Sequence, residues 1–471
     1  MVVNIGQDPV SLDPQFDLTT TALGVYANMF DFLIERDETG KFVPGIAESW
    51  RNVDDRTWEF KLRSGVMFHD GTPLTVEDVK FTYDRVLDPA MKSLRNPNIN
   101  MVERGEVVDP TTFRLVTKEP YAALLSRVAA LEILPKQAVT DLGNDKFALS
   151  PVGSGGYRFK EWVKDDHITL EANPSYWRGA PSIKTVTFKP VAENSTRVSN
   201  LKTAAADIVV NLPPHLATDV ESDKSLRVER VHSLRNIFIG INTFAKPLDD
   251  KRVRQALNHA VDVDAIIKNV LGGSGYRTPG PIGENIFGYD PSIRPYAYDP
   301  DKAKALLAEA GLSSGFDLEF RSPNGRYVQD KEVAEAVAGY LGKVGIRPSL
   351  LVQEWGTFYA DFLAKKYAGI YLFGVGNGFM DADGTLYLHM HSKGRGIYYN
   401  TPRTDELIAK GQTTVNEEER KKVYAETLRA IQDEAPWIFL FDQQDAYGVS
   451  AKLNWKPRQD ERVILTQATL A

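Results

Sequence analysis

The residues from Val43 to Arg85 read VPGIAESWRNVDDRTWEFKLRSGVMFHDGTPLTVEDVKFTYDR and place a strand, a turn and a helix in close succession. Apolar and polar residues alternate along Thr57–Arg63, which predicts a half-buried strand. Thr75 and Asp78 have the spacing of a capping box at the start of a helix. Apolar residues then follow at helical spacing: Val76, Val79, Tyr83 and Val86. This stretch is typical of a protein that mixes helices with a sheet.

Strands and helices alternate again in the third quarter of the chain. Asp299 and Pro300 suit the cap and the first position of a helix, and Gly311 suits its left-handed C-terminal cap. The pattern predicts strands at Phe316–Arg321, Ile346–Val352 and Gly369–Phe373, with helices at Lys331–Val344 and Trp355–Lys366 between them. This βαβαβ order predicts a separate domain with a parallel sheet, so the fold class is α/β.

Composition excludes several classes of protein. The 471 residues, of which 42% are hydrophobic, are enough for two or three domains with conventional cores. A net charge of −7 provides no basic field for phosphate backbones, so we expect no nucleic-acid partner. The apolar run Ala435–Phe441 suits a buried strand better than a membrane span. The chain has no cysteine, which removes thiolate nucleophiles and sulfur ligands for metals.

Motifs for enzyme chemistry are weak. Gly153–Gly156 precedes a strand-like run rather than a helix, so a phosphate-binding turn is not expected there. Asp381 and Asp383 offer a carboxylate pair to a hydrolase, although residues two apart do not face each other on a helix. His389 and His391 offer two ligands to a metal or metal complex, but no third ligand is linked to them. We therefore expect no catalytic residue, no metal and no cofactor.

The densest motifs resemble those of a known family. They are Pro44-Gly-Ile-Ala-Glu-Ser-Trp50, Trp58-Glu-Phe-Lys-Leu-Arg-Ser-Gly-Val-Met-Phe-His-Asp-Gly71 and Glu77-Asp-Val-Lys80. Similar motifs continue along the chain at Leu12–Pro14, Pro151–Tyr157, Asn173–Gly179, Arg252–Asn258, Tyr298–Gly311 and Asp433–Pro436. Together they resemble the family 5 extracellular solute-binding proteins of ABC importers, the peptide, nickel and opine-binding group.

The resemblance implies a two-lobed periplasmic-binding-protein-like fold of type II, in its large three-domain form, with a ligand cleft between the lobes. The first lobe would be discontinuous, from residues 1–42, 150–240 and 443–471. Residues 43–149 would form a domain inserted in it, and residues 241–442 would form the second lobe. The lobes of such a protein close on the solute by hinge motion, and the closed form is recognised by the membrane permease.

The resemblance also implies a location and a solute class. The protein would be a monomeric periplasmic component without enzyme activity, with its signal peptide removed, since the chain opens Met1-Val-Val-Asn-Ile without a signal sequence. The solute would be a peptide or a peptide-like compound. Alternatives are an opine, a sugar conjugate or an oligosaccharide. A hydrolase that uses Asp381 and Asp383, or a metal-complex binder that uses His389 and His391, is supported only by generic residues.

Eight residues are candidates for contact with the solute. Peptide-binding members of the family pair the ligand amine with an acid, but Gly378 stands where that acid would be. Arg326 follows a strand end, where its guanidinium would hold a carboxylate or a phosphate, and Arg321 and Arg395 are alternative cations. Asn377 follows the last strand of the βαβαβ unit, at the end where open α/β sheets bind ligands. The other candidates are the aromatic residues Tyr26, Tyr327, Trp355 and Phe379, and the carboxylates Asp381 and Asp383.

Overall fold

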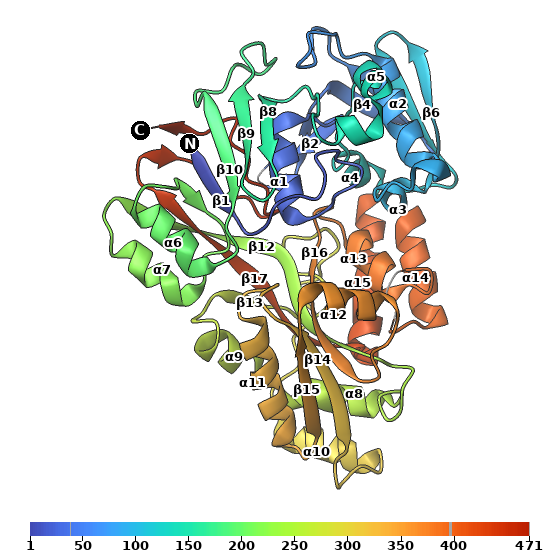
Figure 1. Ribbon diagram of the computed structural model, residues 1–471. Helices are drawn as coiled ribbons and strands as arrows, with labels where there is room; N and C mark the ends of the chain where they lie inside the picture. The colour runs from blue at the N-terminus through green and yellow to red at the C-terminus, as the bar shows by residue number, and fades with distance from the viewer. Residues whose placement is uncertain (38, 395–397, 471) are drawn as a thin grey trace. The chain divides into compact units, whose positions relative to one another are not determined.

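The computed structural model describes residues 1–37, 39–394 and 398–470, and its chain divides into two compact units. Unit 1 consists of Met1–Val231 and Asp445–Ala471, and unit 2 is His232–Gln444. Both divisions fall inside long strands, β12 (Leu226–Ile241) and β17 (Trp437–Ser450) (Figure 1).

The predicted lobe boundaries at 240/241 and 442/443 lie in the same two strands as the divisions of the structure. The alternation of residues continues along a strand and does not mark the point where a compact unit ends. The further division of unit 1 into a lobe and an inserted domain 43–149 stays a prediction.

Unit 1 contains one mixed sheet and one antiparallel sheet. In the mixed sheet, β1 pairs in parallel with β10 and β11, and β9 and β8 follow as antiparallel neighbours (Figure 1). These strands are β1 Val2–Ile5, β8 Tyr157–Val163, β9 His167–Ala172, β10 Thr185–Pro190 and β11 Ile208–Val209. The antiparallel sheet has the order β4-β5-β7-β6. Its strands are β4 Ala47–Asp54, β5 Thr57–Leu62, β6 Val102–Asp109 and β7 Thr112–Thr117.

Short strand pairs and helices complete unit 1. The pairs are β2 Ile34–Arg36 with β3 Phe42–Pro44, and β18 Leu453–Asn454 with β19 Thr469–Leu470. The helices are α1 Thr20–Met29, α2 Val76–Leu87, α3 Asn96–Ile99, α4 Leu124–Val128, α5 Lys136–Phe147, α6 Asn194–Lys202 and α7 Pro214–Glu221, with a 3₁₀ turn at Pro89–Met91. The strand and the capped helix predicted within Val43–Arg85 are confirmed as β5 and α2. The Asp78 carboxylate accepts a hydrogen bond from the Thr75 N–H at 2.8 Å.

His69 joins two of the family-like motifs. Its Nδ1 accepts a hydrogen bond from the Gly153 N–H at 3.1 Å, and its Nε2 lies 3.0 Å from the Gly155 carbonyl oxygen. This geometry fixes the neutral ring with its proton on Nε2, because a second proton on Nδ1 would face the Gly153 N–H. Burial therefore lowers the pKa of His69 from 6.5 to about 4. His69 is therefore a structural residue that satisfies two backbone groups.

Gly153 and Gly155 are required by a close backbone approach. A Cβ atom on Gly153 would lie 2.0 Å from the Met29 carbonyl oxygen, and one on Gly155 would lie 2.6 Å from the Met29 carbonyl carbon. The Gly155 N–H donates to the same Met29 oxygen at 2.9 Å. The Gly-rich segment therefore packs its backbone on the end of α1 and leads directly into β8, which explains why it is not a phosphate-binding turn.

Unit 2 is built on the expected βαβαβ succession. Besides its parts of β12 and β17, its strands are β13 Gly275–Arg277, β14 Asp317–Pro323, β15 Arg347–Gln353 and β16 Ile370–Gly376. Its helices are α8 Lys251–Ala260, α9 Val263–Asn269, α10 Pro300–Glu309, α11 Asp330–Gly342, α12 Trp355–Leu363, α13 Ala382–Met390, α14 Pro402–Thr413 and α15 Glu417–Glu434. Strand β14 pairs in parallel with β15 and with β16, and β16 pairs antiparallel with β12. The capped helix predicted from Asp299 to Gly311 is confirmed as α10, and Gly311 has φ +77°.

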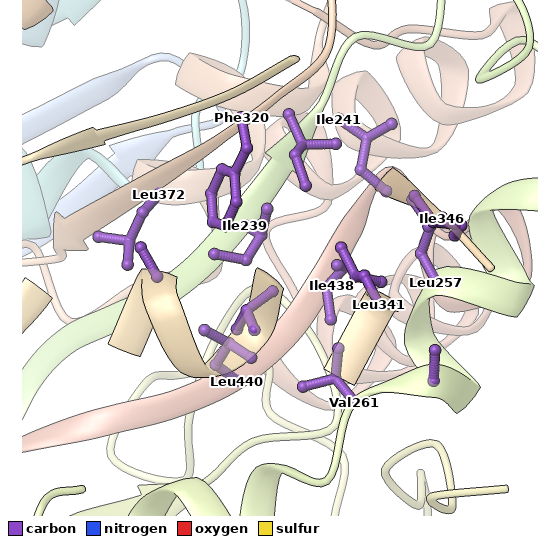
Figure 2. Close-up of a cluster of buried hydrophobic side chains, with 14 of the residues drawn as sticks. Ile239, Ile241, Leu257, Val261, Phe320, Leu341, Ile346, Leu372, Ile438 and Leu440 are labelled. Carbon is purple, nitrogen blue, oxygen red and sulfur yellow. The ribbon is translucent and has the colours of Figure 1, made fainter. Parts of the chain in front are cut away.

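The core of unit 2 lies between this sheet and its helices. Figure 2 shows side chains of β12 and β17, such as Ile239 and Leu440, packed with Phe320 of β14, Leu341 of α11 and Leu257 of α8. These side chains are at most 2% exposed. Burial of this apolar surface holds the parallel strands and α11 in register. Among the described residues, none of the helices is both long and apolar enough to cross a bilayer.

We predict that His69 makes stability depend on pH. In the unfolded chain His69 gains a proton below about pH 6.5, whereas in the folded protein it stays neutral until about pH 4, so its contribution to stability is lost as the pH falls through this window. His69→Ala should lower the unfolding free energy by about 1–3 kcal/mol at pH 7, and this difference should shrink toward pH 4. Denaturant titrations at several pH values measure it. Asp166 raises the pKa of His167, so His167→Ala should not show the same decrease, and a difference for His69→Ala that is constant with pH would contradict the assignment.

We also predict that Gly153→Ala destabilises the fold, because its new methyl group would overlap the Met29 carbonyl oxygen. The expected loss is about 1–3 kcal/mol or more in unfolding free energy. Gly6→Ala is the matched control, since nothing lies within 4 Å of a Cβ atom there. Equal stability of the two variants would show that the close approach at Gly153 is not a constraint.

Candidate functional site

Three loops of unit 2 leave the same edge of its sheet. Strands β14, β15 and β16 are parallel, so their carboxyl ends, at Pro323, Gln353 and Gly376, lie at one edge. Open α/β sheets bind ligands at this edge. Five of the predicted site residues lie in or directly after these loops: Arg326, Tyr327, Trp355, Asn377 and Phe379.

Arg326, Tyr327 and Trp355 form a stack at this edge. The Arg326 Cζ atom lies 5.1 Å from the centroid of the Trp355 ring and 5.2 Å from that of the Tyr327 ring. The two rings meet edge to face with their centroids 6.0 Å apart. Both Arg326 and Trp355 are half-buried, and the two aromatic faces orient the guanidinium. Such an arrangement binds carboxylates and other planar anions.

Tyr327 anchors the stack to the sheet. Its ring is buried, its hydroxyl donates to the Gly374 carbonyl oxygen at 3.2 Å, and burial raises its pKa above the usual value. A Cβ atom on Gly374 would lie 2.7 Å from the Tyr327 ring, so β16 needs a glycine at this point. The stack is therefore fixed to β16 as well as to its own loop.

Asn377 and Asp381 brace the loop after β16. The Asn377 side-chain amide donates to the Asp381 carbonyl oxygen at 2.8 Å and to the Thr385 hydroxyl at 3.1 Å. Asp381 is the N-cap of α13, where it accepts from the Asp383 N–H at 3.0 Å. Its carboxylate also forms two hydrogen bonds with the Arg420 guanidinium, at 2.7 and 2.8 Å, with both side chains buried. The Asp381 carboxylate thus has a structural partner within unit 2.

The remaining predicted residues lie in different surroundings. Asp383 is buried and accepts from the Gln412 side-chain amide at 2.7 Å, and Phe379 is half-buried in its loop. Tyr26 belongs to unit 1, where its ring is fully buried in the core and its hydroxyl donates to the Ser11 carbonyl oxygen at 2.6 Å. These packing roles do not require a solute.

The alternative ligands and cations are also located. His389 and His391 lie at the end of α13, and Nδ1 of His391 accepts from the Lys393 N–H at 3.0 Å. Within residues 1–37, 39–394 and 398–470, no three His, Asp or Glu side chains are grouped so that they could hold a metal ion. Arg321 pairs with Glu319 at 3.0 Å, and Arg395 lies outside the described residues.

Two residues that shape this site were missed by the sequence analysis. Asp330 holds the loop of Arg326 through backbone hydrogen bonds, and Arg420 neutralises Asp381. An acidic residue directly before the predicted helix Lys331–Val344, at its N-cap position, could have indicated Asp330. Nothing in the local sequence indicated Arg420, which lies 39 residues beyond its partner.

Comparison with known proteins identifies the family. Residues 41–396 match the model described as "Bacterial extracellular solute-binding proteins, family 5 Middle". The glutathione-binding protein GsiB of Pectobacterium atrosepticum is 30% identical, over 96% of this chain and 90% of that protein.

Solved structures confirm the predicted fold class. The periplasmic binding protein DppA of Helicobacter pylori, in complex with the peptide STSA, has a TM-score of 0.88 and 25% identity, with 100% of this chain and 98% of that chain covered. AgaA of A. tumefaciens R10, in complex with agropinic acid, has a TM-score of 0.87 and 25% identity, with the same coverage. This chain belongs to the family 5 bacterial extracellular solute-binding proteins, the periplasmic components that bind solutes for ABC importers and deliver them to the membrane permease.

Proposed function

We propose that this protein binds a peptide or peptide-like solute that carries a free carboxylate, and that it delivers this solute unchanged. The observation that carries the proposal is the Arg326 guanidinium, stacked on Trp355 and Tyr327 at the carboxyl edge of the parallel strands. A planar guanidinium that is oriented by two aromatic rings matches a carboxylate through two parallel hydrogen bonds. Trp355 and Tyr327 would also supply apolar surface to the solute next to the charge.

The relatives support an acid as the solute. The protein at 30% identity is named for glutathione, and the two structures at 25% identity contain a peptide and agropinic acid. All three compounds carry a carboxylate. The complex with agropinic acid is the reason to keep an opine as the second candidate.

The surroundings of Arg326 favour a carboxylate over a phosphate. Phosphates bind readily at helix N-termini, where backbone N–H groups are available. The helix that follows Arg326 is α11, and its first turn already has an anion, since the Asp330 carboxylate accepts from the backbone there. A solute anion would therefore rely on the side chain of Arg326.

We also propose that the protein does not hydrolyse its solute. The hydrolase alternative requires Asp381 and Asp383, but Arg420 binds the first carboxylate and Gln412 binds the second. The two carboxylates are therefore not arranged as the acid–base pair that a hydrolase needs. Recovery of a chemically altered solute after incubation with the protein would support the hydrolase instead.

We expect the protein to be a monomer that becomes more compact when it binds its solute, because hinge closure brings the lobes of such proteins together. Mass spectrometry of compounds released by denaturation identifies the solute that co-purifies. Small-angle scattering of the protein, refolded to remove that solute, should show a smaller radius of gyration after the solute is added back. An unchanged radius at saturation would argue against hinge closure.

Arg326→Ala should weaken binding of the identified solute by about 2–5 kcal/mol, since it leaves a buried carboxylate without its partner. Arg326→Lys should recover part of the loss, because an ammonium lacks the planar fork. Isothermal calorimetry measures both. Arg252→Ala is the matched control, because this arginine forms an exposed pair with Asp250 on α8. If Arg326→Ala binds like the parent protein, the solute is neutral or another cation holds it, and the site is misassigned.

A further inference from the structure

We propose that Asp330 is a positioning residue for Arg326. Its carboxylate holds the loop Gly325–Tyr327 so that Arg326 is in place before the solute binds. This inference rests on the proposed function, since it concerns the same guanidinium. It assigns to Asp330 a role in affinity without any contact between Asp330 and the solute.

The geometry of the Asp330 carboxylate supports this role. One oxygen accepts from the Arg326 N–H at 2.8 Å and from the Tyr327 N–H at 3.0 Å. The other accepts from the Gly325 N–H and from the Lys331 N–H, both at 2.9 Å. Asp330 is only 3% exposed. A single buried carboxylate therefore binds three consecutive backbone N–H groups of the loop and one of the helix.

The backbone of the loop needs such an anchor. Gly325 has φ +77°, and Gln329, which is not a glycine, has φ +51°. Left-handed conformations are disfavoured for residues with a side chain, so the turn at Gln329 persists only where other contacts determine it. The Asp330 carboxylate supplies these contacts, because it accepts charge-assisted hydrogen bonds from backbone N–H groups on both sides of the turn.

Other contacts hold the parts of the loop that the Asp330 carboxylate does not bind. The Val328 N–H donates to the Gln443 side-chain oxygen at 3.4 Å, and the Tyr327 hydroxyl donates to Gly374. On the C-terminal side of Arg326, the Val328 backbone is thus tied to β17 and the Tyr327 side chain to β16, while the Arg326 guanidinium is stacked on two rings. A group that is ordered in advance loses less conformational entropy on binding, which raises affinity without a new contact.

A double-mutant cycle tests the inference. Arg326→Ala, Asp330→Ala and the double variant are compared with the parent protein for retention of a pool of dipeptides, tripeptides and reduced glutathione, and the affinity of the retained peptide is measured by calorimetry. Asp330→Ala should weaken binding roughly tenfold or more, and the double variant should bind no more weakly than Arg326→Ala alone. Asp330→Asn, which keeps one oxygen acceptor, should recover part of the affinity. Full additivity of the two substitutions would overturn the inference, because Asp330 would then act independently of Arg326.

The controls separate this inference from loss of folding and from failure of the proposed function. Asp299→Ala removes another helix cap of unit 2, on α10, and should lower thermal stability without changing affinity. If Asp330→Ala does not fold, the same cycle is run with Asp330→Asn. If Arg326→Ala lowers the affinity for the peptide and the Asp330 variants do not, only the role of Asp330 is overturned. An unchanged Arg326→Ala, or a parent protein that retains no peptide, would overturn the proposed site and this inference with it.

Discussion

The parallel pairing of β14 with β15 and with β16 is the constraint on which the candidate site depends. Parallel strands present all their carboxyl ends at one edge, so loops separated by about thirty residues of helix and strand become neighbours there. The register is held by the apolar core between this sheet, α8 and α11. Arg326 and Trp355 meet because the strands that precede them are paired.

Two buried carboxylates show how the same chemical group serves different purposes at this edge. Asp381 forms an ion pair with Arg420 and caps the start of α13, so its charge is balanced within the protein. Asp330 has backbone N–H groups as partners, and burial still raises its pKa above the usual range. The backbone hydrogen bonds lower this pKa, but the effect of burial is larger. At this edge of the sheet, Asp381 is therefore paired with Arg420, whereas Asp330 is a buried anion in the loop that carries Arg326.

Much of the architecture follows from local pattern. The strand and helix of Val43–Arg85, the capped helix α10 and the βαβαβ order of unit 2 were predictable, because alternation, caps and turns are encoded by neighbouring residues. Arg326 and Trp355 were predicted separately, and their contact results from the parallel pairing of the strands that precede them. The partners of Asp381 and the burial of Tyr26 did not, since pairings between distant segments depend on packing that no local pattern records.

Unit 2 is a single uninterrupted segment of the chain, whereas unit 1 is assembled from two segments. The ends of unit 2 lie within β12 and β17, where backbone hydrogen bonds carry the pairing and tolerate a change of side chains. One genetic recombination with crossovers in these two strands would transfer Arg326, Trp355 and their supporting loops together. The proposed solute-binding loops are thus transferable as one unit, and the rest of the protein is retained.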